Sequence, residues 1–168
     1  AGSFFVSDFQ LQDVDFQLQK DSQFWLGKFS SPIAKGKFSY PLDIKINSIA
    51  SGTFDYLRFG KYKKKMDWPI DPRNLPALQI QTSQLEFNGY SFKDVELKTE
   101  PSATGIVINS LKGKGEDLRI TLHGTWEVGV NDAHNTSIDI ELLTANLHNS
   151  LAGLGYETGL SKGEGSIS

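Results

Sequence analysis

Two stretches near the C-terminus decide the fold class: residues 118–126 read LRITLHGTW, and residues 137–143 read SIDIELL. In both stretches apolar residues alternate with polar ones, so every second side chain points to the same side. A period of two is typical of a β-strand that has one covered face and one solvated face. The apolar residues lack the three- and four-residue spacing of an amphipathic helix.

The same alternation runs through most of the chain from Phe9 onward. In residues 9–18 (FQLQDVDFQL), the step from Leu11 to Val14 is three residues rather than two, which predicts a turn or a β-bulge at Gln12-Asp13. The chain is therefore expected to be all-β with one short helix. We predict an antiparallel meander that forms a curved, groove-like sheet, and a closed β-sandwich is the alternative.

Two segments depart from the alternation. Residues 50–76 contain a Lys-rich run and the sequence DWPIDPRNLP, which predicts a long connection between strands. Residues 144–168 are expected to hold a short helix and a return strand. Thr144 is a candidate N-cap, and leucines spaced along one helical face lead to Gly155.

A weak internal repeat is visible. DVDFQL (13–18) is similar to DVELKT (94–99), and AKGKF (34–38) has a counterpart in KGKGE (112–116). The pattern predicts sub-repeats at about residues 4–49 and 77–143, within a chain (1–168) that is one fragment of a larger repetitive β-groove protein. Alternating strands with acidic outer residues also resemble one another by chance, so this alternative stays open.

Composition excludes several classes of protein. Of the 168 residues, 22% are charged and 38% are hydrophobic, which is typical of a folded domain. A net charge of -3 does not favour nucleic acid as a partner. The chain has no cysteine, which excludes disulfides and thiolate zinc sites, and no apolar run is long enough to span a bilayer.

The sequence contains no recognisable catalytic or metal-binding motif. His123, His134 and His148 do not have the spacing of metal ligands. The sequence also lacks a nucleophile elbow, a P-loop and a dinucleotide fingerprint. We therefore expect no enzyme, no metal and no cofactor. A hydrolase built on paired carboxylates stays open, because that geometry is invisible in sequence.

The remaining feature is the apolar side of the predicted sheet, which must be covered or must bind something apolar. A second sheet would give an ordinary sandwich, whereas an open trough would accept acyl chains, which need area and no specific polar partner. Strand parity predicts the following groove positions: Phe16, Leu18, Leu78, Ile80, Leu85, Phe87, Val95, Leu97, Ile106, Ile108, Leu118, Ile120, Leu122, Ile138, Ile140 and Leu142.

A second hypothesis follows from the aromatic residues. A β-sandwich could act as a binding or adhesion module for carbohydrate or protein, with exposed aromatic rings forming a flat platform. The candidate rings are Trp25, Tyr56, Trp68 and Trp126, although they are scattered along the chain.

Four sequence elements from Asp71 onward stand out in their order along the chain: Asp71-Pro72-Arg73 with Leu75-Pro76, Gly124-Thr125-Trp126, the leucine-rich helix reaching Gly155-Tyr156, and Gly163-Glu164-Gly165. In these elements the chain resembles the C-terminal half of YhdP-type proteins, which belong to the AsmA-like group that also includes TamB. No catalytic residue is carried over from that group.

The resemblance implies a Gram-negative envelope protein that extends through the periplasm and is tethered to the inner membrane by an N-terminal anchor outside this chain. Such proteins are thought to carry phospholipids along an apolar groove between the inner and outer membranes. The implied partners are therefore phospholipid acyl chains and, through the missing anchor, the inner membrane. This chain would be one segment of the groove.

Overall fold

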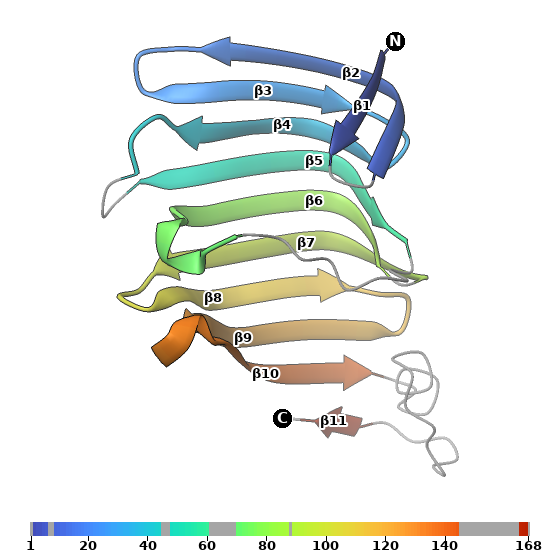
Figure 1. Cartoon of the computed structure of the whole chain (residues 1–168). Helices are drawn as coiled ribbons and strands as arrows, with labels where there is room; N and C mark the ends of the chain where they lie inside the picture. The colour runs from blue at the N-terminus through green and yellow to red at the C-terminus, as the bar shows by residue number, and fades with distance from the viewer. Residues whose placement is uncertain are drawn as a thin grey trace.

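The computed structural model describes residues 2–6, 9–44, 48–60, 70–87, 89–144 and 165–167. They form one sheet of eleven strands whose spatial order follows the order of the sequence (Figure 1). The strands are β1 (Gly2–Val6), β2 (Phe9–Lys20), β3 (Phe24–Ser30), β4 (Ala34–Pro41), β5 (Ile49–Phe59), β6 (Ala77–Phe87), β7 (Tyr90–Pro101), β8 (Gly105–Lys114), β9 (Leu118–Val128), β10 (His134–Thr144) and β11 (Gly165–Ile167). Two 3₁₀ turns, η1 (Pro72–Asn74) and η2 (Val130–Asp132), complete the described elements.

The sheet confirms the predicted fold class, with one departure. Every neighbouring pair of strands is antiparallel except β5 and β6, which run parallel. All strands of the described ranges belong to this single sheet, so a second sheet that would complete a sandwich is absent from them. A parallel pair needs a connection that returns across the sheet, and residues 60–76 supply it.

Placing residues 50–59 in a connection was wrong, because they form most of β5. Two features made β5 difficult to predict from the alternation of apolar and polar residues. Ala50 and Gly52 are buried yet too small to mark an apolar face, and an irregularity at Asp55 shifts the parity. As a result Phe54 and Leu57 lie on the same side despite their odd spacing.

The expectations for residues 42–46 and for the C-terminus had mixed outcomes. Leu42, Ile44 and Ile46 alternate with polar residues, a pattern that predicts a strand over residues 42–46. In the structure β4 ends at Pro41, residues 42–43 form a bend, and 45–47 lie outside the described residues. The predicted helix falls on residues 145–154, also outside the described ranges, and Thr144 is the last residue of β10. The expected return strand is β11, which pairs with β10 (Figure 1).

The bulge predicted in β2 is confirmed by the pairing with β1. Gly2 lies opposite Val14 and Phe4 lies opposite Leu11, so β2 carries one extra residue between them. Asp13 has a φ of 53°, in the left-handed region. Aspartate tolerates this region better than most residues with a Cβ atom.

β7 has the same kind of bulge at Asp94. The φ of Asp94 is 51°, and the pairing of β7 with β8 shifts register there. The two DV motifs of the suggested repeat therefore share a backbone conformation. The second half of the match does not correspond, because AKGKF (34–38) begins β4 whereas KGKGE (112–116) ends β8. The sub-repeats themselves stay a prediction.

Irregularities at the same level of three neighbouring strands bend the sheet. The ladder is interrupted at Asp55 in β5, at Ser83 in β6 and at Asp94 in β7. Extra residues of this kind bend a strand and increase its local twist. Figure 1 shows β5, β6 and β7 bending together toward one end, which gives the sheet its curvature.

Candidate functional site: one apolar face

The pairing register brings every predicted groove residue onto one face of the sheet. Residues directly opposite each other on paired strands point to the same side. The ladder therefore links Leu18 on β2 to Ile140 on β10 through partners on each strand between them. We call this side the apolar face and the opposite side, which carries most of the charged residues, the polar face.

The register adds side chains that strand parity had missed. Three of them belong to β5, and three others are separated by a bulge in β7 or β8 from the predicted positions on their strands. For those three, the signal that could have found them is the bulge itself. The added apolar-face residues are Trp25, Phe29, Phe38, Phe54, Leu57, Phe59, Tyr90, Phe92, Leu111 and Trp126.

At the centre of the sheet the apolar face is closely packed. Val95 is 8% exposed and Phe92 is also buried, although both lie on a face without a second described sheet. They pack around Gly113, where an added Cβ atom would lie 3.2 Å from Val95 and 3.5 Å from Ile120. The missing side chain at Gly113 thus lets larger neighbours close over it.

An aromatic cluster covers the apolar face near β2, β3 and β4. The Phe16 ring lies 6.4 Å from the Phe29 ring edge-on and 6.4 Å from the Phe38 ring in a stacked arrangement. Phe38 lies over Gly27, where a Cβ atom would come within 2.2 Å of the ring. Phe16 and Phe38 are on strands separated by β3, so their contact depends on the space above Gly27.

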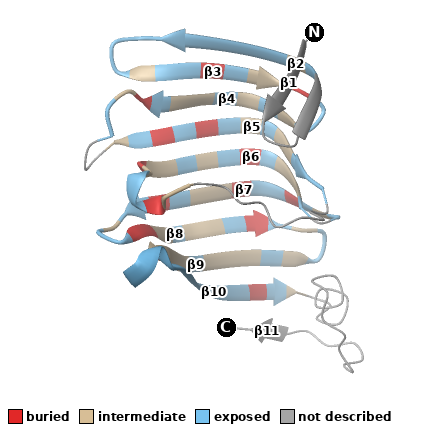
Figure 2. Cartoon of the chain, in the orientation of Figure 1, coloured by how far each residue is buried: buried red, intermediate tan, exposed pale blue. Residues whose placement is uncertain are grey.

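The apolar face is open at the edges of the sheet. Leu18 on β2 is 48% exposed and Ile140 on β10 is 42% exposed, and Phe16 and Ile138 beside them are similarly accessible. Figure 2 shows the contrast between the exposed β2 and the buried positions of the central strands. Exposed apolar side chains that continue from strand to strand mark a surface that binds something apolar.

One described segment covers part of this face. Residues 70–76, here called the strap, contain η1, which contacts β8 and β9. Pro72 and Pro76 are fully buried, and Ile106 and Val128 on the adjoining strands are also buried. Figure 1 shows η1 in front of the sheet. The strap therefore closes one end of the apolar face.

Polar contacts hold the strap in place. The Asp71 carboxylate accepts a hydrogen bond from the Arg73 backbone N–H at 2.9 Å and pairs with the Arg73 guanidinium at 2.7 Å. Arg73 reaches on to Asp132 in η2 at 3.3 Å. The hydrogen bond from the Arg73 side chain lowers the pKa of Asp71 below its usual value, so this carboxylate is charged at neutral pH.

A scan against family models decides the family. The model described as YhdP protein matches residues 1–168, the whole chain. The chain belongs to the YhdP family. This is a family of cell-envelope proteins within the AsmA-like group. No curated protein and no solved structure matches the chain.

Of the four rings proposed as a platform, the three that the structure describes do not come together in this YhdP-family chain. Trp25 lies on β3 and Trp126 on β9, far apart along the strand order, and the Trp126 indole donates to His134 Nδ1 at 3.2 Å. Tyr56 is on the polar face, with its hydroxyl donating to the Ser31 carbonyl at 2.7 Å. Trp68 lies outside the described residues.

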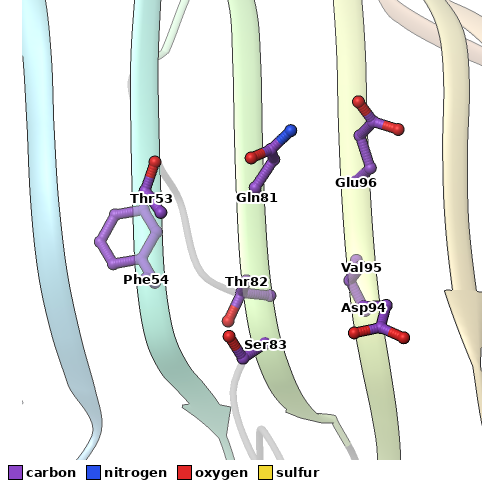
Figure 3. Close-up of a pocket in the computed structure, with 8 residues that line it drawn as sticks. All are labelled: Thr53, Phe54, Gln81, Thr82, Ser83, Asp94, Val95 and Glu96. Atoms are coloured by element: carbon purple, nitrogen blue, oxygen red, sulfur yellow. The ribbon is translucent and has the colours of Figure 1, made fainter.

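The polar face of the YhdP-family sheet has hollows but no convergent chemistry. A hollow of about 300 Å³ lies over the bent strands, where Thr53, Gln81 and Glu96 are neighbours (Figure 3). The described part of the chain contains no group of three potential metal ligands. His123 contacts the carbonyl of Asn109. His148 lies outside the described ranges.

None of the helices in the described ranges has the length and apolar character needed to cross a membrane.

Proposed function

We propose that this chain forms a stretch of wall in a lipid conduit, along which acyl chains move passively over the apolar face. The observation that carries the proposal is the continuity of that face across β2 to β10, with Leu18 and Ile140 exposed at its two ends. Acyl chains gain free energy from apolar contact area and require no polar partner. The contact of each predicted groove residue with lipid stays a prediction.

Family membership supports the identity of the cargo. YhdP-family proteins belong to the AsmA-like envelope group, so the proposed cargo is phospholipid moving between the inner and outer membranes. The proposed location is the periplasm, with tethering to the inner membrane through an anchor outside this chain. We propose no enzymatic step, because passive transfer along a wall needs neither a nucleophile nor a cofactor.

Site-specific photocrosslinking in cells tests the proposal. A photoreactive amino acid at Ile120 or Ile140 would lie on the apolar face, and the same amino acid at Thr121 or Glu141 would lie on the polar face. The control positions are sequence neighbours on the same strands, so backbone location is matched. We expect phospholipid adducts from Ile120 and Ile140 and few from Thr121 and Glu141.

Two results would count against the conduit. Apolar-face positions that yield no lipid adduct while the protein is folded and expressed would remove it. Equal labelling from both faces would indicate nonspecific contact with membrane lipid. Protein–protein adducts from Ile140 alone would instead indicate that another polypeptide covers this face.

A further inference from the structure

A hollow of about 550 Å³ lies where β5 and β6 end. Its lining combines apolar residues with an ion pair: Ile33, Phe59 and Tyr90 on one hand, Arg58 and Glu86 on the other. Because Arg58 and Phe59 are consecutive strand residues, they point to opposite faces. The hollow therefore lies at the rim where the apolar face meets the polar face.

The guanidinium of Arg58 is fixed before any ligand binds. Its Nη1 donates to the Pro32 carbonyl at 3.0 Å, and its Nε donates to Glu86 Oε1 at 3.3 Å. The group also stacks 4.4 Å from the centre of the Tyr56 ring. A planar fork held in this way loses little conformational freedom when it binds an oxyanion, and arginine matches phosphate geometry well.

Glu86 places a carboxylate beside this cation. Its Oε1 accepts from Arg58 and also from Gln84 Nε2 at 2.9 Å. Within the described residues no hydrogen bond involves Oε2, and the Glu86 side chain is partly exposed. The hollow thus presents a fixed cation and an available anionic oxygen as direct cross-strand neighbours.

An aromatic row extends from the hollow along the apolar face. Phe59 pairs with Phe87, and Phe87 pairs with Tyr90, so the three rings lie side by side on neighbouring strands. Phe59 and Phe87 are both exposed. A molecule with its polar group at Arg58 can therefore lay an acyl chain directly over these rings.

We propose that this hollow binds the zwitterionic headgroup of a phospholipid, whose phosphate accepts from Arg58 and whose ammonium donates to Glu86. A purely anionic headgroup would meet the Arg58 guanidinium but would also face the Glu86 carboxylate. The inference rests on the proposed function, since the lipid tail is taken to occupy the apolar face. It adds a position for the headgroup and a preference among headgroups.

Calorimetric titration of the 168-residue chain tests this inference. The probes are monomeric lysophospholipids with phosphoethanolamine or phosphoglycerol headgroups and a fatty alcohol, all with the same chain length. Arg58→Gln should weaken both lysophospholipids roughly ten- to a hundredfold and leave the alcohol unchanged, because hydrogen bonds to charged groups are of that strength. Glu86→Gln should remove the preference for phosphoethanolamine.

The matched control is Lys98→Gln, which removes the cation of another exposed ion pair on the polar face, the one with Glu96 at 2.9 Å. It should change no affinity. If Arg58→Gln does not fold, Arg58→Lys replaces it and should weaken phosphate binding two- to threefold, since lysine lacks the fixed fork.

The outcomes separate the headgroup site from the conduit. If the wild-type chain binds all probes equally, or if Arg58→Gln weakens the alcohol as much as the phospholipids, the headgroup assignment is overturned while the apolar conduit stands. If no probe binds, the apolar face does not take acyl chains and both proposals fail.

Discussion

Single residues in unusual backbone conformations decide which side chains reach the apolar face. Asp13 and Asp94 both adopt positive φ at a bulge, and each shifts the parity of its strand by one residue. Without that shift, Val95 and the residues after it would point to the polar face. The bulge in β2 could be predicted because Leu11 and Val14 mark it with a three-residue step.

Substitution of Asp94 tests the role of the left-handed conformation. Asp94→Gly should be neutral or slightly stabilising, because glycine adopts positive φ without strain. Asp94→Val should destabilise the chain by about 1–2 kcal/mol, because a β-branched residue resists this region. Urea unfolding measures both. Lys114, which pairs with Asp94 at 3.0 Å, loses its partner in both variants, so the difference between them isolates the backbone. Equal unfolding midpoints would contradict the account.

The close approach of β9 and β10 gives a second residue whose substitution can be tested. A Cβ atom added at Gly124 in β9 would lie 2.2 Å from the Ser137 carbonyl oxygen of β10. Gly124→Ala should therefore force the two strands apart and cost about 1–3 kcal/mol in the free energy of unfolding. Gly60→Ala is the control, since an added Cβ atom meets nothing within 4 Å there. A Gly124→Ala variant as stable as the control would show that the backbone relaxes freely.

At the scale of elements, the antiparallel hairpins were predictable from the sequence, whereas the parallel pairing of β5 and β6 was not. Alternation gives β9 and β10 directly, because each apolar residue has a polar neighbour. β5 was missed because alanine and glycine occupy its first two apolar-face positions and an irregularity at Asp55 shifts the parity of the others. The strap was recognised as a proline-rich connection, yet no sequence pattern states that Pro72 and Pro76 bury themselves on the sheet.

The strap should loosen in acid. The pKa of Asp71 in the folded chain lies below its usual value of 3.8, so the carboxylate stabilises the strap fully above that value. This contribution is lost as pH falls through the lowered pKa, when the carboxylate is protonated. The protection factor of the Arg73 amide, corrected for intrinsic exchange, should therefore drop below about pH 4. Asp71→Asn should lack this pH step, and an unchanged wild-type protection factor in acid would refute the mechanism.

For the whole molecule, the apolar face is a property of the register and not of any one strand. Its composition was predictable, because alternating residues must share a side. The extent to which the apolar face stays accessible was not predictable, because accessibility depends on the curvature of the sheet, on the strap and on long-range strand pairing. The headgroup hollow was equally hidden, since Arg58 and Glu86 meet only through the parallel pairing of β5 and β6.

Two isoleucines on this face test its uneven covering. Ile106, beside the strap, is 5% exposed, whereas Ile140 is 42% exposed. Ile106→Ala should cost about 3 kcal/mol and Ile140→Ala about 1 kcal/mol, because a cavity forms only where the site is enclosed. Thermal or urea unfolding measures the difference. Equal losses would mean that the edge of the face is as covered as the centre.

Because strand order equals sequence order, the length of the sheet across its strands follows directly from the number of strands. The described residues form eleven strands within a chain of 168 residues, which is about 15 residues of chain for each of these strands. Each strand advances the sheet by about 4.8 Å, so ten steps give a length of about 48 Å across the strands. Inserting one hairpin would lengthen the sheet by roughly 10 Å. All the existing residues would keep their side chains on the same face as before. Length is thus set by the number of strands and width by the residues in each, and the two can vary independently.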